Sequence, residues 1–275
     1  MRIRAGFTIA YDCPAPTPML LVLNIHPSRR VDLLTDHVLR FENSNGTPIE
    51  AWDYVDGFEN ACTRIIAPAG VTTIATEFDM FDHGRPDIVA EHAVQHEIRD
   101  LPDDVLVYLL GSRYCDTDRL ADFAWKEFAN TPPGWARVQA IVDFVHNHIT
   151  FDYQKADSLR SAHGGYNDKV GVCRDFAHLA ITLCRCMNIP ARYCTGYLGD
   201  IGIPPVDYPM DFSAWFEVYL GGHWYTFDAR HNTPRIGRIL MATGRDATDV
   251  ALSTSFGPAR LAQFDVVTDE VPAEG

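Results

Sequence analysis

The stretch of residues 171–184 constrains the fold of this chain more than any other. A glycine-ended loop leads into Cys173, and apolar side chains then recur at helical spacing, so the sequence predicts a helix that begins at the cysteine. At a helix start, the unpaired backbone N–H groups and the positive end of the helix dipole favour an anion. For a thiol that anion is the thiolate, the nucleophilic form. The plain alternative is a buried and chemically inert cysteine.

The other six cysteines predict no special chemistry. Cys184 and Cys186 lie two positions apart in a helical stretch and therefore point to different faces, and the chain has no C-x-x-C pair. The sequence thus supports neither a metal site nor a redox motif, and no cofactor is expected. An odd total of seven cysteines is typical of free thiols in a reducing compartment.

Strands are predicted after this helix. A proline at position 190 ends the helix, and a strand follows to about residue 198. Two aromatic-rich segments, residues 213–220 and 223–228, flank a Gly-Gly pair and predict a β-hairpin. The predicted order is therefore a loop, a cysteine-headed helix and then antiparallel strands.

This order, together with the residues that carry it, resembles the transglutaminase-like superfamily of papain-like cysteine enzymes, which includes bacterial cysteine peptidases. The resemblance covers roughly residues 135–235 and is most specific at 171–178. It implies that Cys173 is the nucleophile and that Asp228, at the end of a strand, is the orienting acid. In the family a histidine directly precedes the Ala-Trp pair of the preceding strand, whereas this chain has Ser213 there.

The serine matters because its hydroxyl cannot act as a general base near neutral pH. Another histidine could reach the site, other charges could hold the thiolate, or the site could have lost turnover. His231, three residues after Asp228, is the leading substitute, ahead of His163 in the loop before the cysteine and His178 on the helix. A surface or hydrogen-bonded histidine with no catalytic role is the alternative for each.

Other side chains near the motif are candidates for binding the substrate. Arg174 could pair with a carboxylate, and Tyr153 and Trp215 could line an acyl pocket or donate to an oxyanion. His163 could fold over the site from its loop. For each of these residues a structural role is the alternative, and for the aromatic residues that role is core packing.

The resemblance implies thiol-based acyl chemistry on an amide through a thioester on Cys173. The reaction would be hydrolysis of a peptide or isopeptide bond, or transfer of the acyl group to an amine, and the sequence does not separate the two. The expected substrate is a peptide or a small amide-containing molecule. The rival interpretation is a retired domain of the same fold that acts as a binding or assembly protein, and Ser213 is its main support.

Composition restricts the partners. A net charge of −14 argues against nucleic acid, because phosphate binding requires a basic face. The first residues lack the apolar run of a secretory signal, and no apolar stretch is long enough to span a bilayer. We therefore expect a cytoplasmic protein without membrane contact, and the sequence allows an oligomer.

The expected architecture is α+β, with a papain-like core behind an N-terminal β-sandwich. Short alternating segments and polar turns predict the sandwich over residues 1–105. The catalytic domain is expected over 106–266, with helices at 117–128 and 135–148 and a loop at 157–168, and residues 267–275 are expected to form an acidic tail.

Overall fold

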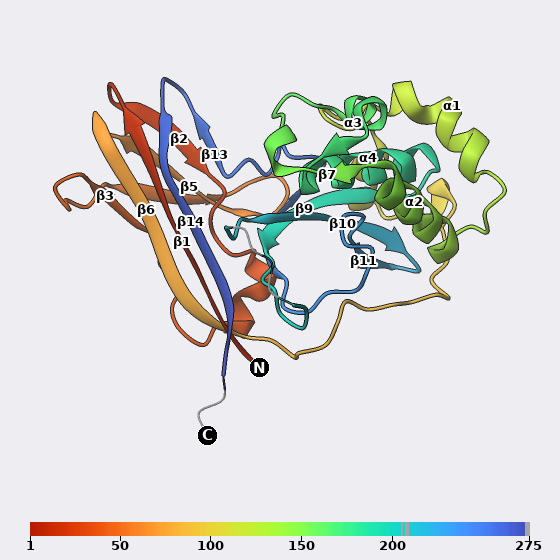
Figure 1. The fold of residues 1–275 in the computed structure, drawn as a ribbon, viewed down its shortest axis with the longest axis horizontal. Helices are drawn as coiled ribbons and strands as arrows, with labels where there is room; N and C mark the ends of the chain where they lie inside the picture. The colour runs from red at the N-terminus through yellow and green to blue at the C-terminus, as the bar shows by residue number, and fades with distance from the viewer. Residues whose placement is uncertain (205, 207–208, 273–275) are drawn as a thin grey trace.

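Two antiparallel sheets packed face to face form the strand-rich half of the protein (Figure 1). The computed structural model describes residues 1–204, 206 and 209–272. The first sheet has the order β14-β1-β6-β3 and the second has the order β13-β2-β5-β4. Their strands are β1 (Arg2–Cys13), β2 (Thr17–Leu21), β3 (Arg40–Asn43), β4 (Ala51–Val55), β5 (Ala61–Ala67), β6 (Gly70–Phe81), β13 (Ser253–Ser255) and β14 (Arg260–Val271).

Alternation of side chains along β1 explains why it lies inside this sandwich. Ile3, Ala5 and Ile9 are fully buried on one face, as expected for a strand with one face on a core. The same apolar cluster continues into Tyr197 and Met241, which belong to the neighbouring central sheet. The two halves of the protein therefore share a hydrophobic core.

The C-terminal strand corrects the predicted acidic tail. β14 pairs with β1 along its whole length, from Arg2 opposite Val271 to Asp12 opposite Arg260, with a bulge on the way. Residues 267–271, predicted to be tail, thus belong to a strand; residues 273–275 lie outside the described part of the chain. The physical reason is the free backbone edge of β1, which a strand from the far end of the sequence satisfies. Two sandwich strands, β13 and β14, come from after the mixed half.

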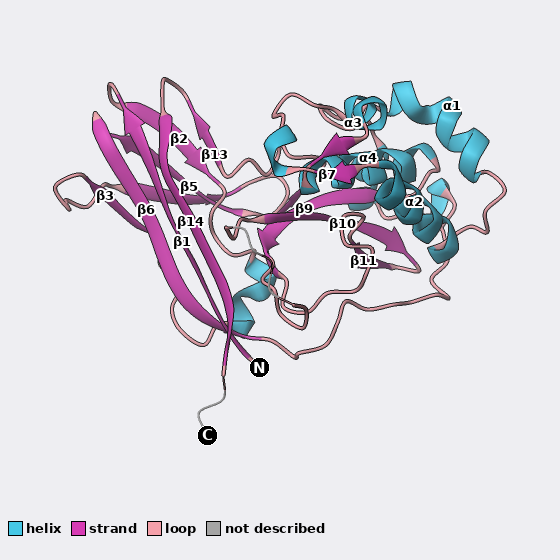
Figure 2. Cartoon of the chain, in the orientation of Figure 1, coloured by secondary structure: helices cyan, strands magenta, loops and turns pink. Residues whose placement is uncertain are grey.

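The mixed half confirms the predicted α+β architecture: helices gather at one end of the molecule around a central sheet of order β11-β10-β9-β12 (Figure 2). Its elements are α1 (Thr117–Phe128), α2 (Trp135–His148), α3 (Ala162–Asp168), α4 (Cys173–Cys186), β7 (Thr150–Phe151), β8 (Val170–Gly171), β9 (Ala191–Tyr197), β10 (Ser213–Leu220), β11 (His223–Phe227) and β12 (Ile239–Gly244). Short 3-10 helices span Pro27–Asp32, Ile98–Asp100, Asp103–Leu109 and Tyr153–Lys155.

The predicted helices at 117–128 and 135–148 are confirmed, as are the helix that begins at Cys173 and the hairpin around the Gly-Gly pair. Gly221 and Gly222 have φ values of +56° and +86°, the left-handed conformations that a tight hairpin turn requires. The predicted loop at 157–168 instead contains α3, because the Ser161 hydroxyl accepts a hydrogen bond from the Gly164 N–H and caps a short helix.

Helix α4 is the centre of the mixed half. It packs on β9 and β10 on one side and on the other three helices on the other, and nearly every side chain from residue 175 onward is buried. Only its first turn, which carries Cys173, keeps partial exposure. The fold therefore places the partly exposed thiol of Cys173 at the first turn of a helix that is otherwise buried.

Candidate active site

A buried carboxylate shapes the loop that delivers Cys173. Asp175 Oδ2 accepts hydrogen bonds from the Val172 N–H at 2.8 Å and from Arg160 at 3.2 Å. A Cβ on Gly171 would lie 2.7 Å from both Cβ and Cγ of Asp175, so only glycine fits beside it. This explains why Gly171, Cys173 and Asp175 occur together in the motif. Gly171 leaves room for the Asp175 side chain, and Asp175 in turn fixes the backbone just before Cys173.

Cys173 lies beside the start of β10. The backbone N–H of Ala214 hydrogen-bonds the thiol, and Arg230, Asp211 and Asp228 are close enough to act on it electrostatically. Burial raises the pKa of the Cys173 thiol above its usual value, and the opposing effects of Arg230 and the Ala214 N–H do not cancel it. Burial thus opposes the preference for a thiolate that the helix start provides, and a nearby base would help to remove the thiol proton.

His231 and Asp228 form a hydrogen-bonded pair. His231 Nδ1 lies 2.8 Å from Asp228 Oδ2, and because a carboxylate only accepts, Nδ1 carries the proton. The other ring nitrogen, Nε2, is then either a free base or, in the charged ring, a donor. The Asp228 side chain is 3% exposed while that of His231 is 23% exposed, so the acid is enclosed and the imidazole reaches the surface of the site.

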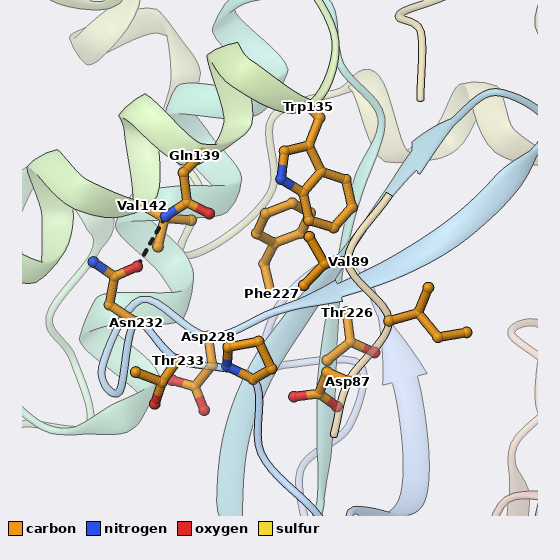
Figure 3. A pocket seen from close by; sticks show the side chains of 12 residues that line it. Asp87, Val89, Trp135, Gln139, Val142, Thr226, Phe227, Asp228, Asn232 and Thr233 are labelled. Atoms are coloured by element: carbon orange, nitrogen blue, oxygen red, sulfur yellow. Dashed lines mark hydrogen bonds between the residues drawn. The ribbon is translucent and has the colours of Figure 1, made fainter. Parts of the chain in front are cut away.

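Arg238 is the cation that keeps Asp228 ionised. Burial by itself raises the pKa of this carboxyl, but Arg238, 2.9 Å away, and His231 together hold the pKa well below its usual range. Arg238 also contacts Asp87 at 3.0 Å, so the pair extends into a buried chain of alternating charges. A cavity of about 110 Å³ lies next to Asp228, between α2 and β11 (Figure 3).

Ser213 and His231 line one pocket of about 320 Å³. Tyr153 contributes to the same wall, as does Arg230, whose guanidinium lies 3.9 Å from the ring centre of Phe151. Ser213 itself is 8% exposed. The structure thus brings three of the predicted site residues, Tyr153, Ser213 and His231, into one pocket beside the strand end that hydrogen-bonds the nucleophile candidate.

Two predicted substrate-binding residues lie elsewhere. Arg174 hydrogen-bonds the carbonyl of Asp157 and lies over the ring of Tyr114, which gives it a structural role. Trp215 is 2% exposed and stacks with Arg238 at 4.9 Å, and it is not among the residues that line the pocket at Ser213. Ser213 and Trp215 share one face of β10, but Trp215 lies two residues farther along the strand, where it lines a different pocket together with Arg238.

The other two histidine candidates are occupied. The ring of His163 lies beside Asn167 on α3, at 3.3 Å, outside the residues that line the pocket. His178 is completely buried, its Nε2 accepts a hydrogen bond from the Ala247 N–H at 3.2 Å, and burial lowers its pKa. His178 is therefore a neutral core residue.

Helix α2 holds the loop that carries His231. The sequence did not predict this contact between helix and loop. His146 Nδ1 lies 3.1 Å from the carbonyl oxygens of both Ala229 and Arg230. The side chain of Asn232, just beyond His231, accepts a hydrogen bond from Gln139 of the same helix (Figure 3). It also donates to Asp143 of that helix at 2.9 Å. No local pattern links a helix to a loop some eighty residues later, so only the tertiary structure identifies these contacts.

Within the described ranges, no group of three or more His, Cys, Asp or Glu side chains is arranged to hold a metal ion. Nor does that part of the chain contain a helix long and apolar enough to cross a membrane.

Comparison with known proteins adds to this geometry. The family model of the transglutaminase-like superfamily matches residues 123–229. An uncharacterized protein of Mycobacterium leprae is 35% identical over 139 residues, which is 49% of this chain and 46% of that protein. An uncharacterized protein of Mycobacterium tuberculosis is 28% identical over 175 residues, 58% of this chain and 54% of that protein. The chain therefore spans about half the length of the curated relatives it matches.

A solved structure is similar over the whole chain. The crystal structure of a "putative cysteine protease" from Cytophaga hutchinsonii superposes with a TM-score of 0.83 at 30% identity, covering 100% of this chain and 92% of that one. The similarity thus extends across the sandwich as well as the mixed half.

Proposed function

This chain belongs to the transglutaminase-like superfamily, and from that premise we propose that it is a cysteine-dependent enzyme acting on amides. Cys173 is the nucleophile, His231 the base and Asp228 the acid that orients it. The observation that carries the proposal is the 2.8 Å contact between His231 Nδ1 and Asp228 Oδ2, which leaves Nε2 to exchange a proton. His231 thus takes the function that the family assigns to the position of Ser213.

The proposed reaction has two steps. Nε2 of neutral His231 removes the thiol proton as the Cys173 sulfur attacks the amide carbon, and the C–N bond then breaks while the imidazolium protonates the leaving amine. The resulting thioester is attacked by water or by a second amine, which returns the thiol. The raised pKa of Cys173 fits this scheme, because a protonated thiol needs a base in the first step.

Ser213 has a passive part in this scheme. Its small side chain leaves the pocket to the imidazole that arrives from the loop after β11. Whether the product is a carboxylate or a new amide depends on whether water or an amine reaches the thioester first. Both reactions belong to the proposal, and a cytoplasmic location with a peptide or small amide substrate remains part of it.

The test measures alkylation of Cys173 by iodoacetamide from pH 5 to 10, with each cysteine followed by peptide mass spectrometry. His231→Ala should slow the reaction at pH 7 about tenfold or more, because the base is lost. Ser213→Ala is the matched control, since it removes a polar group from the same pocket, and it should react like the natural protein. A His231→Ala protein that reacts as fast as the natural one would refute the assignment and favour a retired binding domain.

A rescue experiment sharpens the assignment. Ser213→His, placed in the His231→Ala protein, restores an imidazole at the position where the family carries its base, and we expect it to recover part of the lost rate. A screen of peptides with and without added amine then separates hydrolysis, which releases a carboxylate, from transfer, which forms a new amide.

A further inference from the structure

We propose that His146 is a positioning residue that fixes His231 in its catalytic orientation, an inference that rests on the proposed function. His146 does not line the pocket at Ser213 and acts through the backbone of the loop. Its helix, α2, thus becomes part of the machinery that holds the base.

The contact geometry determines the proton on His146. Nδ1 lies 3.1 Å from the carbonyl oxygen of Ala229 and 3.1 Å from that of Arg230. Two acceptors around one ring nitrogen are compatible only with an N–H that donates to both. These two carbonyls belong to the residues between Asp228 and His231, so the His146 N–H holds the backbone that links the acid to the base.

A second anchor closes the loop on its other side. Asn232 has a left-handed φ of +50°, and its side chain contacts Gln139 and Asp143, each at 2.9 Å. His231 is therefore flanked by two attachments to one helix. Its own backbone N–H donates to Asp228 Oδ1 at 3.1 Å, which completes the constraint from the side of the acid.

Loss of His146 would remove the side chain of α2 that donates to the carbonyl oxygens of Ala229 and Arg230. Ala229 is 2% exposed, so water does not readily replace the missing hydrogen bond. The loop is then expected to shift until its carbonyls find new partners, and the His231–Asp228 contact loosens with it. A displacement of about 1 Å at a catalytic group is enough to lower a rate by a large factor.

His148 provides a matched control on the same helix. Its Nε2 lies 2.7 Å from the carbonyl oxygen of Tyr166, so it too bonds a backbone carbonyl, but one in α3 rather than in the loop of the base. Replacing either histidine by alanine removes a similar side chain from α2. Only His146→Ala should affect His231.

The experiment uses the full chain and two readouts. Histidine-ring nitrogen NMR reports the fraction of His231 protonated at Nδ1, and iodoacetamide reports the reactivity of Cys173. His146→Ala should lower the Nδ1-protonated fraction of neutral His231 and slow alkylation about tenfold, whereas His148→Ala should change the rate less than twofold. His146→Asn keeps an amide donor near the place of Nδ1 and should recover most of the rate.

Three results are decisive. Unchanged His231 signals in a folded His146→Ala protein would overturn the proposal, as would equal losses in the two alanine variants. If the signals shift but neither His146→Ala nor His231→Ala slows alkylation, the positioning holds and the proposed function fails. The two claims are thus tested separately.

Discussion

Replacing Gly171 with alanine tests the account of the loop that delivers the nucleophile. The new methyl group would lie 2.7 Å from Cβ and Cγ of Asp175, well inside van der Waals contact. Asp175 is 2% exposed and has no room to turn toward solvent. Relief of the clash must therefore break its hydrogen bonds to the Val172 N–H and to Arg160.

The magnitude follows from those losses. A helix-capping hydrogen bond is worth about 1 kcal/mol, and forcing an extra methyl group into a packed site costs about 1–3 kcal/mol. We expect Gly171→Ala to lower the free energy of unfolding by about 3 kcal/mol in total, which corresponds to a Tm lower by roughly 6–10 °C for a chain of this size.

Urea unfolding followed by circular dichroism measures this change, with thermal melting as a second readout. Gly57→Ala is the control, because nothing lies within 4 Å of a Cβ built there, and it should cost less than about 0.5 kcal/mol. An Asp175→Ala background removes the clashing Cγ and the carboxylate but keeps the Cβ, so it relieves part of the clash and should make Gly171→Ala cheaper by about 1 kcal/mol. Equal stability of the Gly171→Ala and Gly57→Ala proteins would refute the reasoning.

Three further predictions concern charges. Arg238→Met leaves Asp228 buried without its main cation and should destabilise the fold by about 3–5 kcal/mol in urea unfolding; a neutral effect would contradict the network. Because burial raises the pKa of Cys173, alkylation of the His231→Ala protein should still accelerate above pH 9, where an ordinary thiol of pKa about 8.5 approaches its plateau; a plateau below pH 8 would count against this. Burial lowers the pKa of His178, so below about pH 6.5 this histidine is protonated in the unfolded chain but stays neutral in the folded protein. The free energy of unfolding therefore decreases as the pH is lowered. His178→Gln should reduce that fall between pH 6.5 and 5, and an unchanged slope would show that other groups cause it.

Local patterns predicted the elements that carry the site. The helix after Cys173 follows from its apolar spacing, and the hairpin follows from the pair Gly221-Gly222, whose conformations no other residue adopts so easily. The contact of Asp228 with His231 is also local, because the two residues are only three positions apart. For this reason His231 could be proposed from the sequence, whereas the orientation of its ring toward Asp228 is visible only in the structure.

Non-local contacts could not be predicted in this way. The pairing of β14 with β1 joins the two ends of the sequence, and nothing in the acidic segment after residue 266 identifies its partner. The contact of His146 with the loop before His231 is equally remote. The pKa of Cys173 could not be predicted for the same reason. The helix start is visible in the sequence, but the burial that raises the pKa depends on residues from distant parts of the chain that pack around the thiol.

The strand β14 also determines the order in which the sandwich can be assembled. The mixed half is inserted between β6 and β13, so β1 pairs with β6 early in synthesis but meets its other neighbour only after residues 260–271 have emerged from the ribosome. Pairings between such distant segments form slowly. Until then the twelve-residue strand β1 presents an open backbone edge, which is a template for wrong pairing between nascent chains. Pairing of β14 with β1 thus covers the exposed edge last, and we expect the nascent chain to be most prone to wrong pairing just before β14 is synthesised.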